Sequence, residues 1–284
     1  MLGFGVDIGG SGIKGAAVDL EEGTLASDRF KVLTPQPSTP VAVAGAVAEV
    51  VAHFNWQGCV GCTFPAVVQQ GVARTAANVD SSWIGTNIET VVGAATGLPV
   101  HAVNDADAAG IAETYWGAAK GTRGLVIVVT LGTGIGVALI YDGVLVPNAE
   151  LGHLEIDGAD YEPRASAAAR EREALSWDKW ARRVQRYLSA LEALLWPDLF
   201  VLGGGVSRRA EKFLPLLALK TPTVPARFQN EAGIAGAAYL ASGLPPRYRI
   251  DAAAPAQQVQ HLAAGQDKAG TPSGPDPGPS ASGG

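Results

Sequence analysis

Residues 125–146, LVIVVTLGTGIGVALIYDGVLV, contain the pattern that decides the fold. An apolar run ends at Gly132-Thr133-Gly134, and a second apolar run follows as far as Tyr141. Asp142-Gly143 is then a turn signal before a third apolar run. Apolar runs divided by turn residues in this way predict a strand, a glycine turn, a strand, a tight turn and a strand.

The same order of signals occurs near the start of the chain. We expect strands at 3–8 and 13–20 around the turn Gly9-Gly10-Ser11-Gly12, and a third strand directly after Glu22-Gly23. Helical stretches follow each copy, at 39–54 and 165–196. Two copies with helices between the strands predict two α/β domains of similar topology with a cleft between them.

Composition and charge restrict the class of protein. The hydrophobic content of 47% fills sizeable cores, and the net charge of −6 argues against a general attraction to nucleic acid or anionic lipid. Two cysteines exclude a disulfide framework, and no signal peptide or run of about 20 apolar residues is present, so we expect a cytoplasmic protein and no membrane span. The segment 245–284 is rich in Pro, Gly, Ala and Ser and is expected to be a disordered tail, with a weak helix at 253–264 as the alternative.

Both glycine turns are candidate phosphate sites. Glycines let a hairpin approach a ligand closely and point its N–H groups at phosphate oxygens, although either turn alone also fits a purely structural hairpin. Asp7 precedes the first turn and is placed to hold a hydrated magnesium ion, or else to cap the turn. A third cluster, Gly203-Gly204-Gly205, follows a short strand and allows a purine or a phosphate to lie against backbone, or is a plain strand-to-helix turn. Side-chain hydroxyls that add donors to the turns are those of Ser11, Thr130 and Thr133.

Polar residues between the two copies suggest an acid–base site. Asp105 follows Asn104 at a junction between a strand near 98–100 and a helix expected to start near Asp107. Its carboxylate can accept a proton from a substrate hydroxyl, or it can cap the helix. Glu150 and His153 are spaced to bracket the vicinal hydroxyls of a sugar, but they also fit half a metal site or a structural histidine.

Two further features have plain alternatives. Cys59 and Cys62 have the spacing of redox and zinc sites, but they lie in an expected buried strand, so neither function is expected. The helix expected after Ser176 has an apolar face and a basic stripe, and residues 164–186 contain seven basic and three acidic residues. A solvated helix face and a track for a long polyanion are both possible. The basic residues of the candidate track are Arg164, Lys179, Arg182, Arg183 and Arg186.

Together, the ordered motifs resemble those of a known family. The set Asp7–Gly15, Asn104-Asp105, Leu131–Gly136, Glu150–His153 and Leu202–Gly205 is similar to that of the ROK sugar kinases, within the actin-like ATPase superfamily. The stretches 11–15, 76–80, 164–166 and 175–177 resemble the branch that phosphorylates glucose from inorganic polyphosphate and often also from ATP. The resemblance covers roughly residues 2–243 and implies a two-lobed, duplicated ribonuclease H-like fold with an interlobe cleft.

The resemblance also implies residue roles. Asp105 is the expected general base for the 6-hydroxyl of glucose, and Asp7 is expected to organise Mg²⁺ through water. Many members supply another sugar-binding glutamate from a zinc-binding cysteine cluster, which is missing here, so zinc is not expected and we assign that role to Glu162, with Glu155 as the rival. The other expected sugar ligands are Asn78, Asn104, Glu150 and His153. The expected phosphate and nucleotide ligands are Gly9, Gly10, Ser11, Gly12, Lys14, Thr130, Gly132, Thr133, Gly134, Gly203 and Gly204.

The expected organisation is a small lobe at 1–105, a large lobe at 106–244 and the tail, with a helix at 230–243 packing back on the small lobe. The expected partners are glucose, polyphosphate and ATP, with no nucleic acid and no membrane, and the expected assembly is a homodimer. Three alternatives remain: a strictly ATP-dependent hexose or N-acetylhexosamine kinase, a sugar-sensing repressor and a non-catalytic sugar-binding protein. An intact Asp105 argues against the last, and a phosphate motif so close to Met1 argues against the repressor.

Overall fold

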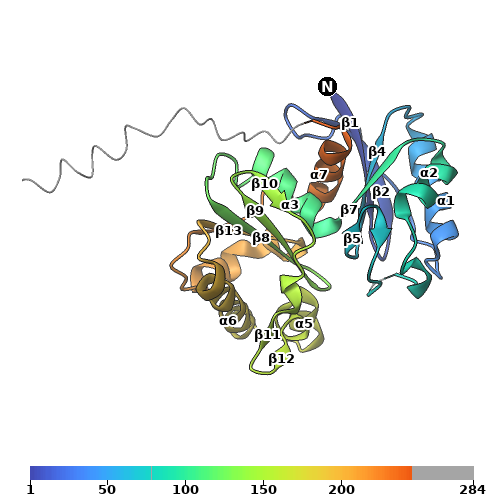
Figure 1. Ribbon diagram of the computed structural model, residues 1–284. Coiled ribbons are helices and arrows are strands. Elements are labelled where there is room, and N and C mark those ends of the chain that lie inside the picture. Colours follow the sequence, from blue (N-terminus) through green and yellow to red (C-terminus); the bar gives the residue numbers. More distant parts are fainter. Residues whose placement is uncertain (78, 245–284) are drawn as a thin grey trace, which may run out of the picture. The chain divides into compact units, whose positions relative to one another are not determined.

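The computed structural model describes residues 1–77 and 79–244 (Figure 1). The prediction for Asn78 and those for the tail at 245–284 lie outside the described residues. Within the described part the chain forms a mixed α/β fold with two five-stranded sheets.

The first sheet has the strand order β3-β2-β1-β4-β7. Neighbouring strands are antiparallel from β3 to β1 and parallel from β1 to β7. Its strands are β1 (Leu2–Ile8), β2 (Ile13–Asp19), β3 (Phe30–Val32), β4 (Val60–Phe64) and β7 (Val100–Asn104).

The alternation of residues along β1 explains how its two faces are covered. Phe4, Val6 and Ile8 lie on one face, where they form a core with the helix α1 (Pro40–His53). The residues between them face the helix α7 (Ala232–Ala241), and a side chain at Gly5 would overlap the carbonyl of Ile234. Glycine is therefore required where the backbone of α7 lies directly on the sheet.

The second sheet repeats the arrangement with the order β10-β9-β8-β13-β14. Three antiparallel strands are again followed by two parallel neighbours. Buried apolar residues of the helix α6 (Trp177–Leu195) share a core with residues of this sheet, while α3 (Asp105–Tyr115) packs on β9. The strands are β8 (Leu125–Leu131), β9 (Ile135–Tyr141), β10 (Val144–Val146), β13 (Leu199–Gly203) and β14 (Thr223–Pro225).

Shorter elements connect the sheets and carry much of the site. The helices among them are α2 (Ile88–Thr96), α4 (Glu162–Ala165) and α5 (Ala167–Arg172). Two small hairpins pair β5 (Val68–Gln69) with β6 (Val72–Ala73) and β11 (Glu155–Ile156) with β12 (Ala159–Asp160). The 3₁₀ turns are η1 (Ser81–Trp83), η2 (Leu151–His153), η3 (Gly205–Lys212), η4 (Leu214–Leu216) and η5 (Gln229–Glu231).

The predicted strands of both copies are confirmed, with one error. The third strand of the first copy does not start after Gly23, because the hydroxyl of Ser27 accepts the N–H of Ala17 (3.1 Å) in place of a strand carbonyl. Leu25 therefore makes only an isolated bridge to Val18, and the ladder resumes at Phe30.

The helix boundaries needed two corrections. The helix expected from about Asp107 begins at Asp105, since the side chain of Asn104 accepts the N–H groups of Ala106 (2.8 Å) and Asp107 (3.1 Å). The helical segment expected over 165–196 is divided between α5 and α6. Ala174 stands between them at φ +46°, a left-handed conformation that ends a helix.

Neither a membrane-spanning helix nor a disulfide occurs among the described residues. No helix in the described ranges is long and apolar enough to cross a membrane. Cys59 and Cys62 are both free thiols, and burial in β4 raises the pKa of Cys62 to about 12. Cys62 therefore remains protonated at neutral pH and is a poor nucleophile or metal ligand there.

Candidate active site

The first glycine turn is built around Asp7. The turn is closed by a hydrogen bond from the N–H of Gly9 to the carbonyl of Gly12 (3.1 Å). Asp7, the penultimate residue of β1, accepts a hydrogen bond from the hydroxyl of Thr63 (2.7 Å) and forms an ion pair with Lys14 (2.9 Å). The same Thr63 hydroxyl accepts the N–H of Ile8 (3.2 Å), so Thr63 ties the carboxylate to the start of the turn.

Thr63 was not among the predicted site residues. It lies in β4, 56 residues from Asp7 along the chain, and reaches Asp7 only because β1 and β4 pair in parallel with these two residues opposite each other. Nothing in the local sequence signals this register. Thr63 fixes the orientation of a carboxylate that the sequence had identified.

The second glycine turn is one residue shorter, is also closed by a backbone hydrogen bond and has an acidic neighbour. The N–H of Gly132 donates to the carbonyl of Gly134 (2.9 Å). The carboxylate of Glu162, at the start of α4, accepts the N–H of Ile135 (2.8 Å), and it fills the space beside Gly134 that a side chain would need. The backbone N–H of Ile135 therefore holds the Glu162 carboxylate against the second glycine turn.

The third glycine cluster lies beside the second turn. Gly203 at the end of β13 is opposite Thr130 in β8, and a side chain at Gly204 would overlap the carbonyl of Leu131. Gly204 also has φ +82°, a conformation that glycine adopts without strain. The hydroxyl of Thr130 makes a long hydrogen bond to the carbonyl of Gly136 (3.4 Å), so it is not oriented by a strong internal partner.

Asp105 is the first residue of α3 and is not its cap. Asn104 supplies the cap and also donates from its amide to the carbonyl of Ala66 (3.1 Å). The Asp105 carboxylate is therefore free of the capping role and accepts the adjacent N–H of Ala106 (2.8 Å). Solvent reaches Asp105. The pKa of Asp105 is raised to about 6, mainly because the protein packed around the carboxylate removes part of its hydration. The negative charges of Asp7 and Glu150 raise it further. A carboxylate with such a pKa is a better proton acceptor near neutral pH than an ordinary aspartate.

Glu150 immediately precedes the 3₁₀ turn η2, and His153 is its last residue. A side chain at Gly152 would overlap the carbonyl of Ile135, so the glycine lets this turn lie directly on the second glycine turn. The hydroxyl of Tyr187 in α6 donates to the carbonyl of Leu151 (2.9 Å) and supports the turn from the other side.

Asp160 orients His153. The ring Nδ1 of His153 lies 2.9 Å from the Asp160 carboxylate, and this hydrogen bond is the main cause of the raised pKa of His153, with smaller contributions from Glu162 and Glu150. Asp160 also accepts the N–H of Glu162 (2.9 Å). One aspartate, which sequence reasoning missed, thus links two predicted sugar ligands, and only the pairing of β11 with β12 brings it there.

The predicted site residues therefore form two linked groups. The charges of Asp7 and Glu150 both act on Asp105, and those of Glu150 and Glu162 act on His153. Glu155 is exposed in β11 and makes no side-chain hydrogen bond or ion pair among the described residues, whereas Glu162 contacts the second glycine turn. The assignment of the additional glutamate to Glu162 stays a prediction, as do the other roles.

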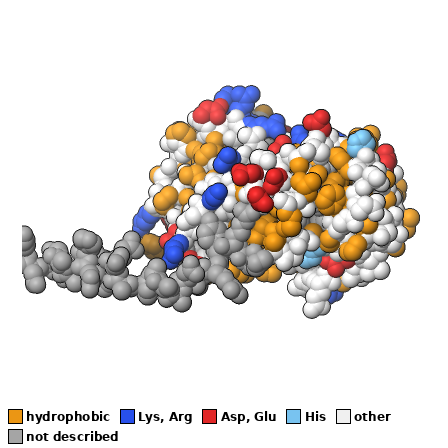
Figure 2. All heavy atoms as spheres, turned by 90° about the horizontal axis from the view of Figure 1, so that it is seen from above, with side chains coloured by type: hydrophobic (Ala, Val, Ile, Leu, Met, Phe, Trp, Pro, Cys, Tyr) orange, Lys and Arg blue, Asp and Glu red, His pale blue; other side chains and the backbone are white. Residues whose placement is uncertain are grey.

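The basic stripe on α6 is accompanied by acidic partners. Arg182 pairs with Asp178 (3.3 Å), Arg183 with Glu173 (2.7 Å) and Arg186 with Asp157 (2.8 Å). On the face of the molecule drawn in Figure 2, basic and acidic side chains likewise lie beside one another. The apolar face of α6 is confirmed as a core face. The polyanion track stays a prediction, and three of its four arginines already have acidic partners.

Comparisons with known proteins agree with this geometry. The model of the ROK family matches residues 3–171. Polyphosphate glucokinase of Mycobacterium tuberculosis is 56% identical over 237 residues, covering 83% of this chain and 89% of the relative. The crystal structure of inorganic polyphosphate/ATP-glucomannokinase from Arthrobacter sp. strain KM is 55% identical, with a TM-score of 0.82 and coverage of 85% of this chain and 98% of that chain.

A more distant structure carries ligands. A ROK family glucokinase from Streptomyces griseus in complex with glucose and AMPPNP is 28% identical, with a TM-score of 0.72 and coverage of 85% of this chain and 99% of that chain. The similarity extends over nearly the whole of each structure compared. The described fold is thus the actin-like fold of these sugar kinases.

Proposed function

The chain belongs to the ROK family, and from that premise we propose that it is a polyphosphate glucokinase, which transfers a phosphoryl group to the 6-hydroxyl of glucose from inorganic polyphosphate and also from ATP. The observation that carries the proposal is the placement of Asp105, which Asn104 frees from the capping role and whose carboxylate solvent reaches within range of the charges of Asp7 and Glu150. The 56% identity to a polyphosphate glucokinase supports the choice of substrates.

Asp105 acts as the general base. The 6-hydroxyl oxygen attacks the terminal phosphorus of the donor, a new O–P bond forms, and the bridging P–O bond breaks. The hydroxyl proton passes to the carboxylate of Asp105, and the donor leaves one phosphoryl group shorter. Asn104, Glu150, His153 and Glu162 hold the remaining sugar hydroxyls, with His153 oriented by Asp160. Phosphoryl transfer depends on this positioning more than on covalent chemistry by the protein.

The two glycine turns bind the transferred phosphoryl group and the phosphate next to it. Each turn is closed by a backbone hydrogen bond between its first and last residues, and each presents N–H groups beside a carboxylate, Asp7 at the first and Glu162 at the second. The third cluster at Gly203-Gly204 binds the rest of an ATP donor. A metal ion compensates the charge that these carboxylates and the phosphates bring together.

The residues present fit a magnesium ion that arrives with the donor. No cluster of three or more His, Cys, Asp or Glu side chains able to hold a metal occurs in the described part of the chain. Mg²⁺ commonly keeps several waters and binds through one carboxylate plus substrate phosphates, and Asp7 is the carboxylate at the phosphate turn. Bound Mg²⁺ supplies charge neutralisation on the transferred group, while Lys14 and Thr63 hold Asp7 in place.

Steady-state kinetics test the function. The rate of glucose 6-phosphate formation is measured with polyphosphate and with ATP, and the acceptors glucose, mannose and N-acetylglucosamine are compared. We expect activity with both donors and preference for glucose. Activity with ATP alone would instead support an ATP-dependent hexose kinase, and sugar binding without transfer would support a non-catalytic protein. Mutation of Asp105 to Asn should lower kcat by about 10²–10⁴-fold.

The assembly and the cellular location of the protein are two further predictions. We expect a homodimer, which sedimentation velocity at micromolar concentration checks. We also expect a cytoplasmic location, which fractionation of cells checks.

A further inference from the structure

A polyphosphate donor extends beyond the phosphoryl group that is transferred, so a glucokinase using it must bind additional phosphates. The arginines of α6 at positions 182, 183 and 186 are each neutralised by a carboxylate of the same chain. A paired arginine binds a further anion less well, because the anion must compete with the carboxylate. Cations without an acidic partner that lie nearer to the glycine turns are better placed to bind these phosphates.

Lys31 lies at the first glycine turn. Its side chain fills the space that a side chain at Gly12 would occupy. Within residues 1–77 and 79–244 Lys31 forms no ion pair, unlike Lys14, which pairs with Asp7. Lys31 also stands directly opposite Lys14 in the pairing of β2 with β3. Like charges directly opposite destabilise a sheet, and a bound anion between them would remove that penalty.

Arg29 extends the same row of positive charge. Arg29 directly precedes β3 and lies two residues before Lys31, about 7 Å away along an extended chain. Lys31 lies within β3, and its side chain points to one face of the sheet. That face is the one on which Asp7 and Lys14 lie, because each pair of opposite residues shares a face. The helix α7 covers β1, β2 and β4 on this side, while β3 is the edge strand. The row formed by Lys31 and Arg29 therefore leads from the phosphate turn along the edge of the sheet, while Lys14 stays paired with Asp7.

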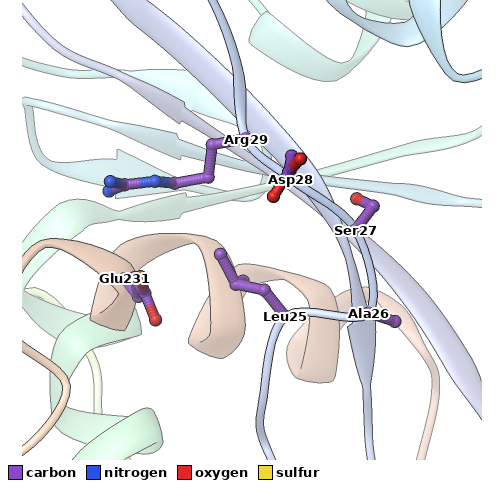
Figure 3. A pocket seen from close by; sticks show the side chains of 6 residues that line it. All are labelled: Leu25, Ala26, Ser27, Asp28, Arg29 and Glu231. Atoms are coloured by element: carbon purple, nitrogen blue, oxygen red, sulfur yellow. The ribbon is translucent and has the colours of Figure 1, made fainter.

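A hollow of about 770 Å³ lies at the end of this row. It is lined by residues 25–29 and by Glu231, which immediately precedes α7. In Figure 3 the Arg29 side chain extends away from Ser27 and Asp28 and toward the side on which Glu231 lies. Arg29 forms no ion pair with either carboxylate. Its charge is therefore available to an anion that enters the hollow from the turn.

We propose that Lys31 and Arg29 bind the part of the polyphosphate chain that follows the transferred phosphoryl group, and that this chain runs along β3 rather than along α6. The inference rests on the proposed function. The ligand is a linear chain of phosphates, which needs a line of cations and no pocket for a base or sugar. Asp28 and Glu231 limit this subsite to a short stretch of chain, because they repel phosphates that extend past Arg29.

The test compares three variants with the wild-type protein. Lys31→Gln, Arg29→Gln and the double variant are assayed with long-chain polyphosphate, with tripolyphosphate and with ATP, at saturating glucose. Lys120→Gln removes a lysine from an exposed turn after α3 and controls for the loss of charge alone. We expect the double variant to raise the KM for long-chain polyphosphate about tenfold and the KM for ATP less than twofold. The plot of log KM against log salt should lose about one unit of slope per removed cation.

Other outcomes overturn the proposal in distinguishable ways. An unchanged KM for polyphosphate in the double variant rejects it, and an equal change for both donors shows that these residues serve the common phosphate turn only. A large effect of Lys179→Gln with Arg182→Gln, with none from the β3 variants, places the chain on α6. If wild-type protein uses ATP but neither turns over nor binds polyphosphate by calorimetry, the proposed function fails first, and this inference fails with it.

Discussion

The carboxylate of Asp107 accepts a hydrogen bond from the backbone N–H of Asn148 at 2.8 Å. Asn148 in turn bonds both backbone groups of Val68 with its side-chain amide, each at 2.8 Å. Asp107 belongs to the helix that starts with Asp105, and Asn148 lies two residues before Glu150. This contact therefore connects the helix of the proposed catalytic base to the segment that carries Glu150, a proposed sugar ligand.

Mutation of Asp107 to Ala should raise the KM for glucose more than it lowers kcat. The loss of the bond frees the segment at 147–150, so Glu150 is no longer held in position before the sugar binds. We expect a change of about tenfold in KM, equivalent to one lost hydrogen bond to a charged group. Asp107→Asn, which keeps an acceptor for Asn148, is the matched control and should restore most of the affinity. Equal KM values for wild type and Asp107→Ala would contradict a positioning role.

The pH dependence of catalysis should follow Asp105. A general base must be deprotonated, and the pKa of Asp105 is about 6. We therefore expect kcat/KM for glucose to fall about tenfold per pH unit below pH 6 and to level off above it. The residual activity of Asp105→Asn should lack this acid limb. A wild-type profile that stays flat down to pH 4.5 would show that Asp105 is not the base.

Asp105 should also lower the free energy of unfolding at neutral pH. The pKa of Asp105 is higher in the folded state than its ordinary value of 3.8, so the folded state binds the proton more tightly. The free energy of unfolding should accordingly fall as pH rises from about 4 through 6. We expect Asp105→Asn to unfold at a higher temperature than wild type at pH 8 and to lose this advantage near pH 4. Thermal unfolding at both values, with glucose and donor omitted, measures the difference.

Close packing of α7 on the first sheet predicts opposite effects for two glycines. A side chain at Gly61 in β4 would overlap the carbonyl of Ala237, whereas one at Gly45 in α1 would meet nothing within 4 Å. Gly61→Ala should therefore destabilise the protein by about 1–3 kcal/mol through forced displacement of α7. Gly45→Ala, in a helix interior, should be neutral or stabilise by up to about 1 kcal/mol. Urea unfolding of both variants tests the contrast, and a stable Gly61→Ala would mean that α7 can move away from the sheet.

The parts of the fold that sequence could predict depend on local signals. Strands β8, β9 and β10 have the predicted boundaries, because Gly132-Thr133-Gly134 and Asp142-Gly143 place both turns. The late start of β3 could not be predicted, since it depends on the Ser27 hydroxyl replacing a carbonyl in the ladder with Ala17. No local pattern distinguishes that serine from one in an ordinary turn.

The candidate site likewise contains residues that local motifs identify and residues that only tertiary structure brings near. The motifs identified Asp7, Asp105, Glu150 and His153, but not the residues that hold them. Asp160 supports His153 through the pairing of two short strands. The ion pairs of the α6 stripe are hidden for a related reason: Asp157, which pairs with Arg186, lies 29 residues away along the chain. Counting charges along a sequence cannot detect partners that tertiary structure brings near.

The contact between β1 and α7 has a consequence for synthesis of the protein. The strand at Leu2–Ile8 is completed against a helix that begins at Ala232, more than two hundred residues later. A ribosome adding 5–20 residues per second takes roughly 10 to 50 s to make the intervening chain. During that interval the glycine-lined face of β1 has no covering helix, so the nascent chain exposes it to solvent and to chaperones. Folding of the first sheet must therefore finish after most of the second has already been translated.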